Sequence, residues 1–257
     1  MTGISTTQQN NKPLLSIITV VYNGAETIEK TIRSVIHQTY PYIEYIIIDG
    51  ASKDGTQQII EQYQDKITYW QSKPDKGLYD AMNQGLQRAT GEYVWFLNSG
   101  DCIIHSQIAE NIFSFDATSE VFYGETLLVD SNDVEIGLRR KKTPEKLTWK
   151  SFKNGMVVSH QAIIVKRNLA GLYNTNYKFS ADFDWALQIL KKATNIYNTK
   201  TVLIKYLEGG LTKKNIKAGL IERFKIMTNH FGFITTVLMH IPISIKFVIY
   251  FLRHERF

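Results

Sequence analysis

The sequence contains very little cysteine, and it also lacks the segments and patterns that define several classes of protein. Cys102 is the only cysteine among 257 residues, so no disulfide can form within the chain, and a reducing compartment is the simplest expectation. Residues 1–12 are polar, without a cationic stretch followed by an apolar one; we expect a disordered tail and no secretory signal. There is no internal repeat and no low-complexity tract. A composition of 44% hydrophobic and 21% charged residues excludes a disordered chain.

The positive charge is concentrated near the C-terminus. Residues 200–257 hold ten Lys and Arg against three Asp and Glu, whereas the rest of the chain holds 20 and 21. Residues 231–252 are mostly apolar, but a histidine, a proline and Lys246 interrupt them. A charge near the bilayer centre costs about 3 kcal/mol, which disfavours a membrane span. We therefore expect residues 213–257 to form a basic, apolar helical extension that contacts an anionic membrane surface.

Other interpretations of this extension stay open. Its apolar part is either a bent helical hairpin or interfacial segment, a helix packed on the domain, or a helix buried in a dimer, and its basic part is alternatively a solvated helix face. The oligomeric state is therefore undecided, with a dimer among the options. No helix-turn-helix, zinc-finger or RNP pattern accompanies the charge, so we expect no nucleic-acid partner.

Strands and helices alternate through the first hundred residues. Leu15–Val21 is a β-branched run, apolar residues then recur at helical spacing over 28–36, and Ile43–Ile48 is a second apolar strand. Together they predict a right-handed βαβ unit. The pattern continues with a helix over Thr56–Gln64, a strand over Ile67–Trp70, a helix over Leu78–Ala89 and a strand over Glu92–Leu97. This alternation predicts a parallel sheet between layers of helices.

The regular alternation of strands and helices ends after residue 101. Residues 121–129 and 134–139 predict a hairpin, because the residues between them have turn chemistry, and the cationic run 139–142 reads as a solvated face. The remaining expected elements are a helix over 104–113, a strand over 161–165, a helix over 182–192, a strand over 202–206 and a flexible loop over 208–212.

Two early segments place polar residues where predicted strands end. The run TVVYNG, residues 19–24, exposes backbone amides and carbonyls at the C-terminal edge of the sheet. The run DGASKDGT, residues 49–56, begins with Asp49, whose carboxylate is placed to accept a hydrogen bond from a base N–H or a ribose hydroxyl. Ordinary strand-to-helix turns, with Asn23, Asp54 and Thr56 acting as helix caps, are the alternative.

A third segment, DKGLYDAMNQGLQRATGEYVWFLNSGD, covers residues 75–101. Asp80 and Asn83 are three residues apart on the predicted helix and therefore share a face. The segment ends in a polar cluster, Asn98-Ser-Gly-Asp101, directly after an apolar strand. Acidic groups at the carboxyl ends of parallel strands are where α/β folds bind ligands. A solvated helix face with Lys76 paired to Asp80, and a type I turn, are the alternatives.

In combination these three segments resemble family 2 glycosyltransferases of the GT-A fold. The resemblance runs from about Leu15 to Asp101 and continues more weakly to about Thr212. It implies an α/β fold with a GT-A (Rossmann-like), mostly parallel central sheet and flanking helices over residues 13–212, followed by the helical extension 213–257. It also implies a nucleotide-sugar donor, held by Thr19, Tyr22, Asn23, Asp49, Ser52, Asp80, Asn83, Asn98 and Ser99.

The metal site departs from the pattern of this family. Many relatives carry a run of aspartates, the DxD element, where this chain has residues 98–101, and that element holds Mg²⁺ or Mn²⁺ against the diphosphate. Here Asp101 is the only carboxylate. Because hard divalent ions prefer several oxygen ligands, we expect the metal to bind mainly together with the sugar nucleotide.

The resemblance places a catalytic base near the start of the helix predicted over 182–192. The family often has an acidic pair there; in this chain the first acid is replaced by Ala181, and Asp182 aligns with the second. Asp182 is therefore the expected general base, with Asp184 as runner-up and helix capping as the structural alternative. His160 is a candidate contact to the acceptor or the diphosphate, although a single histidine is often structural.

The sequence thus predicts an inverting, metal-dependent transferase that moves a hexose or N-acetylhexosamine from a nucleotide sugar, with UDP-sugars favoured, to an acceptor hydroxyl. The acceptor expected from the resemblance and the C-terminal composition is a lipid-linked glycan of bacterial surface polysaccharide synthesis, on the cytoplasmic side of the membrane. The alternatives are a nucleotidyltransferase and a catalytically degenerate subunit that binds sugar nucleotides. A dehydrogenase is disfavoured because no GxGxxG follows the first strand.

Overall fold

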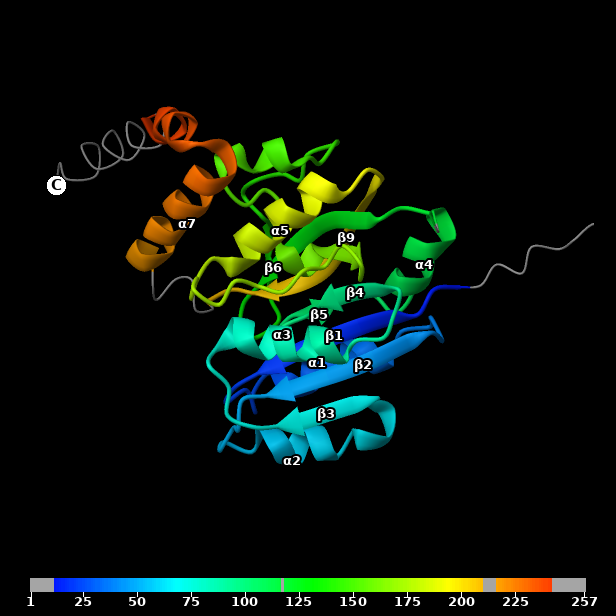
Figure 1. Cartoon of the computed structure of the whole chain (residues 1–257). Helices are drawn as coiled ribbons and strands as arrows, with labels where there is room; N and C mark the ends of the chain where they lie inside the picture. The colour runs from blue at the N-terminus through cyan, green and yellow to red at the C-terminus, as the bar shows by residue number, and fades with distance from the viewer. Residues whose placement is uncertain (1–11, 117, 210–215, 242–257) are drawn as a thin grey trace, which may run out of the picture.

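A computed structural model describes residues 12–116, 118–209 and 216–241 as a sheet flanked by helices (Figure 1). The strands are β1 (Leu15–Val21), β2 (Ile43–Asp49), β3 (Tyr69–Ser72), β4 (Tyr93–Phe96), β5 (Cys102–Ile103), β6 (Val121–Val129), β7 (Glu135–Leu138), β8 (Ile163–Lys166) and β9 (Ile196–Leu207). The helices are α1 (Ile28–Ile36), α2 (Thr56–Glu61), α3 (Leu78–Arg88), α4 (Ile108–Phe115), α5 (Ala181–Lys192) and α7 (Ile216–Phe231). Short 3₁₀ turns cover Gln64–Lys66, Trp149–Asn154 and His160–Ala162.

The strands join in the order β3-β2-β1-β4-β8-β6-β9-β5, and β7 pairs with β6. The first four are parallel to one another, which confirms the predicted α/β sheet. β8 runs antiparallel to both of its neighbours, β4 and β6, so β6 runs in the same direction as β4, and β9 is parallel to β6. The ends of β1, β2, β4, β6 and β9 and the start of β8 therefore meet at one edge of the sheet.

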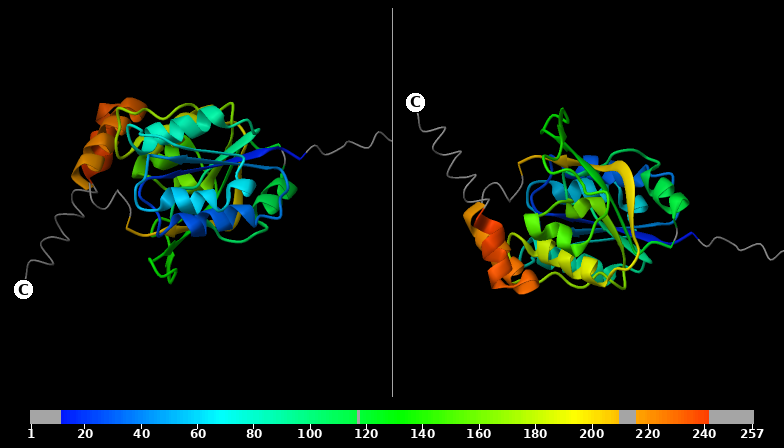
Figure 2. Two further views of the ribbon diagram at one scale, coloured as in Figure 1. Left: turned by 90° about the horizontal axis from the view of Figure 1, so that it is seen from below. Right: turned by 90° about the horizontal axis from the view of Figure 1, so that it is seen from above.

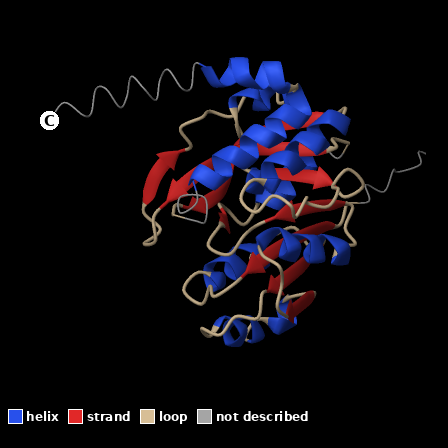
Figure 3. Ribbon diagram, turned by 60° about the vertical axis from the view of Figure 1, so that its left-hand side comes forward, coloured by secondary structure: helices blue, strands red, loops and turns tan. Residues whose placement is uncertain are grey.

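Apolar burial explains why the parallel strands lie in the centre. All seven residues of β1 are buried, as expected for a strand covered on both faces. Figure 2 shows α3 on one face of these strands and α1 with α2 on the other. A Cβ at Gly85 would collide with the side chain of Ile18, so this glycine allows α3 to pack directly on β1. In Figure 3 the helices surround the strands.

The second half of the sheet confirms the predicted hairpin and differs in two strands. β6 and β7 pair antiparallel around a turn in which Asp130 accepts bonds from the backbone N–H of Asn132 and Val134. β9 begins at Ile196, well before the predicted strand. The polar first half of β9 also pairs with β6, and the register of this pairing shifts near Glu125. β5 has two residues, too few for any periodicity to reveal, and pairs antiparallel with β9.

The C-terminal part is helical, as predicted for the start of the extension. α7 ends at Phe231, Gly232 adopts a φ of +84°, and residues 233–241 form another helix. The positive φ favours glycine, and it separates the two helices in Figure 1. Most of the predicted loop 208–212 and the second half of the apolar segment 231–252 lie outside the described residues. Within the described part, no helix combines the length and apolar character needed to cross a bilayer.

Candidate functional site

The sheet edge where β1, β2, β4, β6 and β9 end is called the active edge below. Hydrogen bonds hold the loops after β1 and β2 side by side at this edge. The backbone N–H of Asn23 donates to Ser52 Oγ at 2.7 Å, and the Asn23 side chain accepts from the N–H of Lys53 at 3.1 Å. Asn23 has a φ of +49°, a left-handed conformation that asparagine tolerates better than most residues. One turn further, Asp54 accepts from the N–H of Ala25 and Thr56 Oγ1 accepts from that of Gly24. The two motifs therefore form one bonded unit.

Three of the predicted donor-site residues, Thr19, Asp49 and Ser52, are buried. Asp49 is fully buried and accepts from the backbone N–H of Ser52 at 3.0 Å, from Ser72 Oγ at 2.5 Å and from Ser52 Oγ. Thr19 is also fully buried, and its hydroxyl pairs with Tyr45. Tyr22 differs, since it is 69% exposed at the end of β1. Asp49 and Thr19 therefore stabilise the edge through buried hydrogen bonds, whereas the ring of Tyr22 is exposed to solvent.

Asp75 is a carboxylate at this edge that the sequence reading did not single out. A Cβ placed on Gly50 would lie 2.6 Å from Asp75 Oδ2 and 3.3 Å from the ring of Tyr22, so the carboxylate and the ring flank the space left open by this glycine. Burial raises the pKa of Asp75, and the charges of Asp80 and Asp49 add to that rise. Asp49, Asp75 and Asp80 are thus close neighbours. No spacing in the sequence predicts this, because the contact depends on how the β3–α3 turn folds over β2.

The predicted pair on α3 separates into two environments. Asp80 accepts from the backbone N–H of Lys76 and from Gln84, each at 3.0 Å. Asn83 uses both ends of its amide on the backbone of Tyr173, at 2.9 and 2.7 Å. Asp80 therefore belongs to the carboxylate group around Asp75, while Asn83 attaches the loop before α5 to α3.

The polar cluster after β4 turns back toward the end of β9. Ser99 bonds Thr27 of the β1–α1 loop at 3.0 Å. Asp101 is buried and accepts from Gln161 Nε2 at 3.0 Å and from the N–H of Leu207 at 3.1 Å. Burial raises the pKa of Asp101 to about 7, although both hydrogen bonds oppose the rise. An adjacent cation would favour the ionised form of this carboxyl.

The donor set of this cluster fits a hard divalent cation. Asn98 Oδ1 is buried and has no hydrogen-bond partner among the described residues, and Asp101 supplies a carboxylate near by in the chain. Both are oxygen ligands of the type that Mg²⁺ and Mn²⁺ accept. No group of three or more metal-ligating side chains occurs in the described part of the chain. Substrate oxygens and water would have to complete the coordination.

Asp182 lies at the N-terminus of α5 between two side chains from distant segments. Its Oδ1 accepts from the hydroxyl of Tyr79 at 3.1 Å, and its Oδ2 lies 3.5 Å from His160 Nδ1. Burial favours a higher pKa of Asp182, but the hydrogen bond and charge of His160 and the charge of Arg223 outweigh it and lower that pKa. The side chain is 22% exposed. It is therefore ionised at neutral pH and still reachable by a substrate hydroxyl.

Asp184, two residues further along α5, is enclosed. Its Oδ1 lies 2.6 Å from His230 Nε2 on α7, its Oδ2 accepts from Gln188 at 2.7 Å, and the side chain is 8% exposed. The two candidate bases thus face different partners: Asp182 faces α3 and His160, and Asp184 holds the C-terminal helix.

Three cationic residues, two after β7 and one on α7, had no role assigned from the sequence. Arg139 is half-buried, and its Nη2 donates to the backbone carbonyl of Met156 at 3.2 Å. Arg223, on α7, is also half-buried, and Lys141 donates to the carbonyl of Asn154. The interpretation of 139–142 as a solvated face holds for Arg140, Lys141 and Lys142, which are exposed, but not for Arg139. The run itself gives no signal, because Arg139 meets its partner Met156 only in the folded chain.

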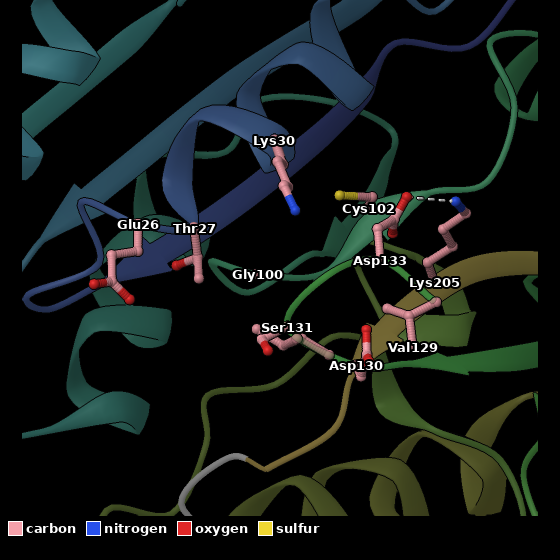
Figure 4. A pocket seen from close by; sticks show the side chains of 11 residues that line it. Glu26, Thr27, Lys30, Gly100, Cys102, Val129, Asp130, Ser131, Asp133 and Lys205 are labelled. Atoms are coloured by element: carbon pink, nitrogen blue, oxygen red, sulfur yellow. Dashed lines mark hydrogen bonds and ion pairs between the residues drawn. The ribbon is translucent and has the colours of Figure 1, made fainter. Parts of the chain in front are cut away.

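A small cavity lies beside this edge and is lined in part by Gly100 (Figure 4). It has a volume of about 80 Å³, and Lys30, Cys102, Asp133 and Lys205 point toward it. Asp133 and Lys205 form an ion pair of 2.9 Å across its rim. None of the predicted site residues lines it. A second hollow, of about 300 Å³, is lined by the β1–α1 loop from Asn23 to Thr27 and by Asp54, next to the donor residues.

Comparison with known proteins places this geometry in a family. The family described as glycosyl transferase family 2 matches residues 16–170. An uncharacterized glycosyltransferase of Mycobacterium tuberculosis is 34% identical over 186 residues, which cover 68% of each chain. TuaG of Bacillus subtilis, a glycosyltransferase ascribed to teichuronic acid biosynthesis, is 30% identical over 77% of this chain and 80% of its own.

Solved structures show the same fold at low identity. Residues 1–349 of S. aureus TarS superpose with a TM-score of 0.69 at 18% identity, covering 90% of this chain and 72% of that one. The chain spans 38% of a longer TarS structure. A mannosyltransferase from Pyrobaculum calidifontis, solved with GDP-Man and Mn²⁺, superposes with a TM-score of 0.63 at 18% identity, covering 90% and 71%. These likenesses confirm the GT-A fold predicted from the sequence.

Proposed function

The chain belongs to glycosyl transferase family 2, and from this membership we propose that it transfers a hexose or N-acetylhexosamine from a nucleotide sugar to an acceptor hydroxyl with inversion. The observation that carries the proposal is the position of Asp182. It is an ionised, partly exposed carboxylate held by Tyr79 and His160 at the edge where the strand ends meet. An inverting displacement needs one such base on the acceptor side.

In this proposal Asp182 accepts the proton of the acceptor hydroxyl as its oxygen attacks the anomeric carbon. Tyr79 orients the carboxylate by donating to Oδ1, which leaves Oδ2 between His160 and the acceptor. The lowered pKa of Asp182 keeps it in the basic form at neutral pH, at the expense of some proton affinity. Asp184 is the less suitable base, because its side chain is only 8% exposed and is enclosed by His230 and Gln188.

The donor base would bind between Tyr22 and Asp75, over Gly50. An exposed aromatic ring offers a stacking surface, and Asp75 Oδ2 lies against the space that Gly50 leaves open, where it can accept a hydrogen bond from a base N–H. Asn23 and Ser52 fix the loop that presents Tyr22. A UDP-sugar is the favoured donor, and S. aureus TarS, with a TM-score of 0.68, has been solved with UDP-GlcNAc.

A divalent metal, Mg²⁺ or Mn²⁺, would be held by Asp101 and Asn98 together with donor oxygens. When bound, it supplies positive charge that stabilises the leaving diphosphate. Neighbouring residues hold this site in position. Ser99 bonds the turn to Thr27, and Gln161 and Leu207 bond the Asp101 carboxylate. The solved complex of the Pyrobaculum mannosyltransferase with Mn²⁺ supports metal use in this fold.

The proposed acceptor is a lipid-linked glycan in bacterial surface polysaccharide synthesis, reached at the cytoplasmic face of the membrane. The biosynthetic role ascribed to TuaG supports the polysaccharide assignment. Support for membrane contact comes from α7 and the helix after it, on which large apolar side chains are exposed.

The test measures nucleoside diphosphate release from a panel of UDP- and GDP-sugars, with and without Mn²⁺, by the full chain. We expect metal-dependent release by the wild type, and a loss of about 10²- to 10⁴-fold for Asp182→Asn because a general base contributes about that much. Glu92→Gln, which removes an exposed carboxylate outside the site, is the control and is expected to retain turnover. Donor binding without any release would indicate a degenerate binding subunit, and an active Asp182→Asn would remove the base assignment.

A further inference from the structure

Cationic side chains from three segments gather beside Asp182. Arg139 follows β7, where its backbone N–H bonds Thr126 of β6 at 3.2 Å. Arg223 comes from α7, beyond the part of the chain that the family model matches. His160 precedes β8 and lies against the Asp182 carboxylate. Two of these side chains also act on Asp182 electrostatically, because the charges of His160 and Arg223 both lower its pKa.

The two arginines are also close to each other. Burial lowers the pKa of Arg139, and the charge of Arg223 lowers it further, while Tyr206 and Asp182 act in the opposite direction. The pKa of Lys141 is lowered by burial and by the charges of the same two arginines. Holding several cations together in a half-buried site is unfavourable without an anion between them. The carboxylate of Asp182 offsets only part of this charge.

Three buried nitrogens in this cluster lack the partners that such groups normally have. Arg139 Nη1, Arg223 Nε and His160 Nε2 have no hydrogen-bond partner among the residues that the structure describes. The His160 side chain is only 6% exposed. A buried donor left without an acceptor is destabilising and uncommon in native proteins. The two guanidinium nitrogens are always donors and His160 Nε2 donates when the imidazole is protonated, so an anion with several acceptor oxygens would satisfy all three.

We propose that Arg139, Arg223 and His160 bind a phosphoryl group of the acceptor substrate, so that α7 completes the active site. The inference rests on the proposed function and refines it: the acceptor glycan is carried on a lipid phosphate or diphosphate. Arginine matches phosphate because its planar fork donates two parallel hydrogen bonds to the same anion. The site would hold the acceptor with its hydroxyl at Asp182.

Two observations favour the acceptor over the donor as the source of this phosphate. The donor diphosphate already has a candidate site at Asn98 and Asp101, which lies at the end of β4 and β9 rather than on α7. The same helix that turns Arg223 inward exposes Leu220 and Ile221, at 57% and 60%. An amphiphilic ligand needs this combination, with a charged group inside the site and an apolar chain outside it.

The test uses the full chain and farnesyl diphosphate as the probe, with binding measured by calorimetry. We expect Arg139→Gln and Arg223→Gln to weaken its binding about tenfold or more, since each removes a charge-assisted contact, and to leave UDP binding unchanged. Arg140→Gln and Lys142→Gln are matched controls, because both are exposed neighbours of Arg139 that lose the same charge. They should bind the probe as the wild type does.

Several outcomes would overturn the proposal. Unchanged farnesyl diphosphate affinity in both arginine variants would exclude the site, and an equal loss of UDP affinity would assign the phosphate to the donor. If a variant does not fold, the wild type still decides, because farnesol binding as tightly as farnesyl diphosphate would exclude phosphate recognition. UDP binding and release by the wild type report separately on the proposed transferase activity, so the failure of one proposal is distinguishable from that of the other.

Discussion

At the scale of single residues, the clearest coupling of charge to stability lies away from the active edge. Glu44 of β2 is buried and accepts from Ser16 Oγ at 2.5 Å and from the N–H and hydroxyl of Thr90 at 2.8 and 2.7 Å. It thereby joins β1, β2 and the turn between α3 and β4. Burial alone would raise the pKa of Glu44, but the bonds from Ser16, Thr90 and Gly91 outweigh burial and lower it.

We predict that Glu44→Gln lowers the free energy of unfolding by about 2 kcal/mol at pH 7, the usual range for hydrogen bonds to a charged group. A pKa lowered in the folded state means that the unfolded chain binds more protons in acid. The stabilisation by Glu44 is therefore present above the unfolded pKa of about 4.3 and is lost as pH falls through the folded pKa. Urea unfolding at pH 7 and pH 3 measures this, and the difference between the two proteins should shrink in acid.

The control for this prediction is Glu92→Gln, whose side chain is 53% exposed and 3.7 Å from Lys166. An exposed pair contributes little, so this variant should unfold almost like the wild type at both pH values. A Glu44→Gln variant equal to the wild type at pH 7 would mean that the buried carboxylate does not stabilise the fold.

At the scale of elements, α7 is attached to the domain by a small number of specific contacts. His230 Nε2 pairs with Asp184 of α5 at 2.6 Å, and the His230 carbonyl accepts from Lys191 at 3.3 Å. At the other end, Glu222 accepts from the backbone N–H of Lys178 and Phe179 at 2.8 and 2.9 Å. The side chain of Asp184 therefore has a structural use, which separates it from Asp182.

We predict that His230→Ala increases amide hydrogen exchange across residues 216–231 while exchange in β1 and β4 stays as in the wild type. The reason is that removing His230 leaves the buried Oδ1 of Asp184 without its hydrogen-bond partner, which costs about 2 kcal/mol. Hydrogen exchange followed by mass spectrometry resolves the helix from the sheet. Lys225→Ala, on an exposed position of the same helix, is the control, and protection of α7 unchanged by His230→Ala would show that the pair does not hold the helix.

The elements predicted from the sequence are those that one strong pattern specifies. β1, β2, α3 and the hairpin follow from apolar periodicity and turn chemistry, which are local properties of the chain. The site depends on contacts between segments, and these have no local signal. Asp75 approaches Gly50 only because β3 pairs with β2, and Arg223 reaches the surroundings of Asp182 only because α7 packs on α5. Asp182 is predicted to be the base because its motif resembles that of a family, and its spacing alone would not identify a base.

At the scale of the whole molecule, apolar and basic surfaces coincide at one end. α7 and the helix over 233–241 expose large apolar side chains, namely Leu220, Ile221, Phe233, Ile234, Leu238 and Ile241, and Lys217 and Lys225 are exposed on the same element. Exposed apolar patches of this kind usually mark an interaction surface. Lysines beside them favour an anionic membrane, since each contributes about 1 kcal/mol near a charged bilayer.

We predict that the full chain sediments with vesicles containing phosphatidylglycerol, and that salt weakens this binding because part of it is electrostatic. The double variant Phe233→Asp with Ile234→Asp should lower vesicle affinity about tenfold or more. It puts charge where two exposed apolar side chains would otherwise enter the bilayer surface. Val134→Asp with Ile136→Asp is a matched control, with two side chains of 59% and 53% exposure on the hairpin, and it should bind as the wild type does. If both double variants lose affinity equally, net charge rather than the C-terminal surface determines binding. If neither does, another surface of the chain binds the vesicles, and the exposed helices face a different partner.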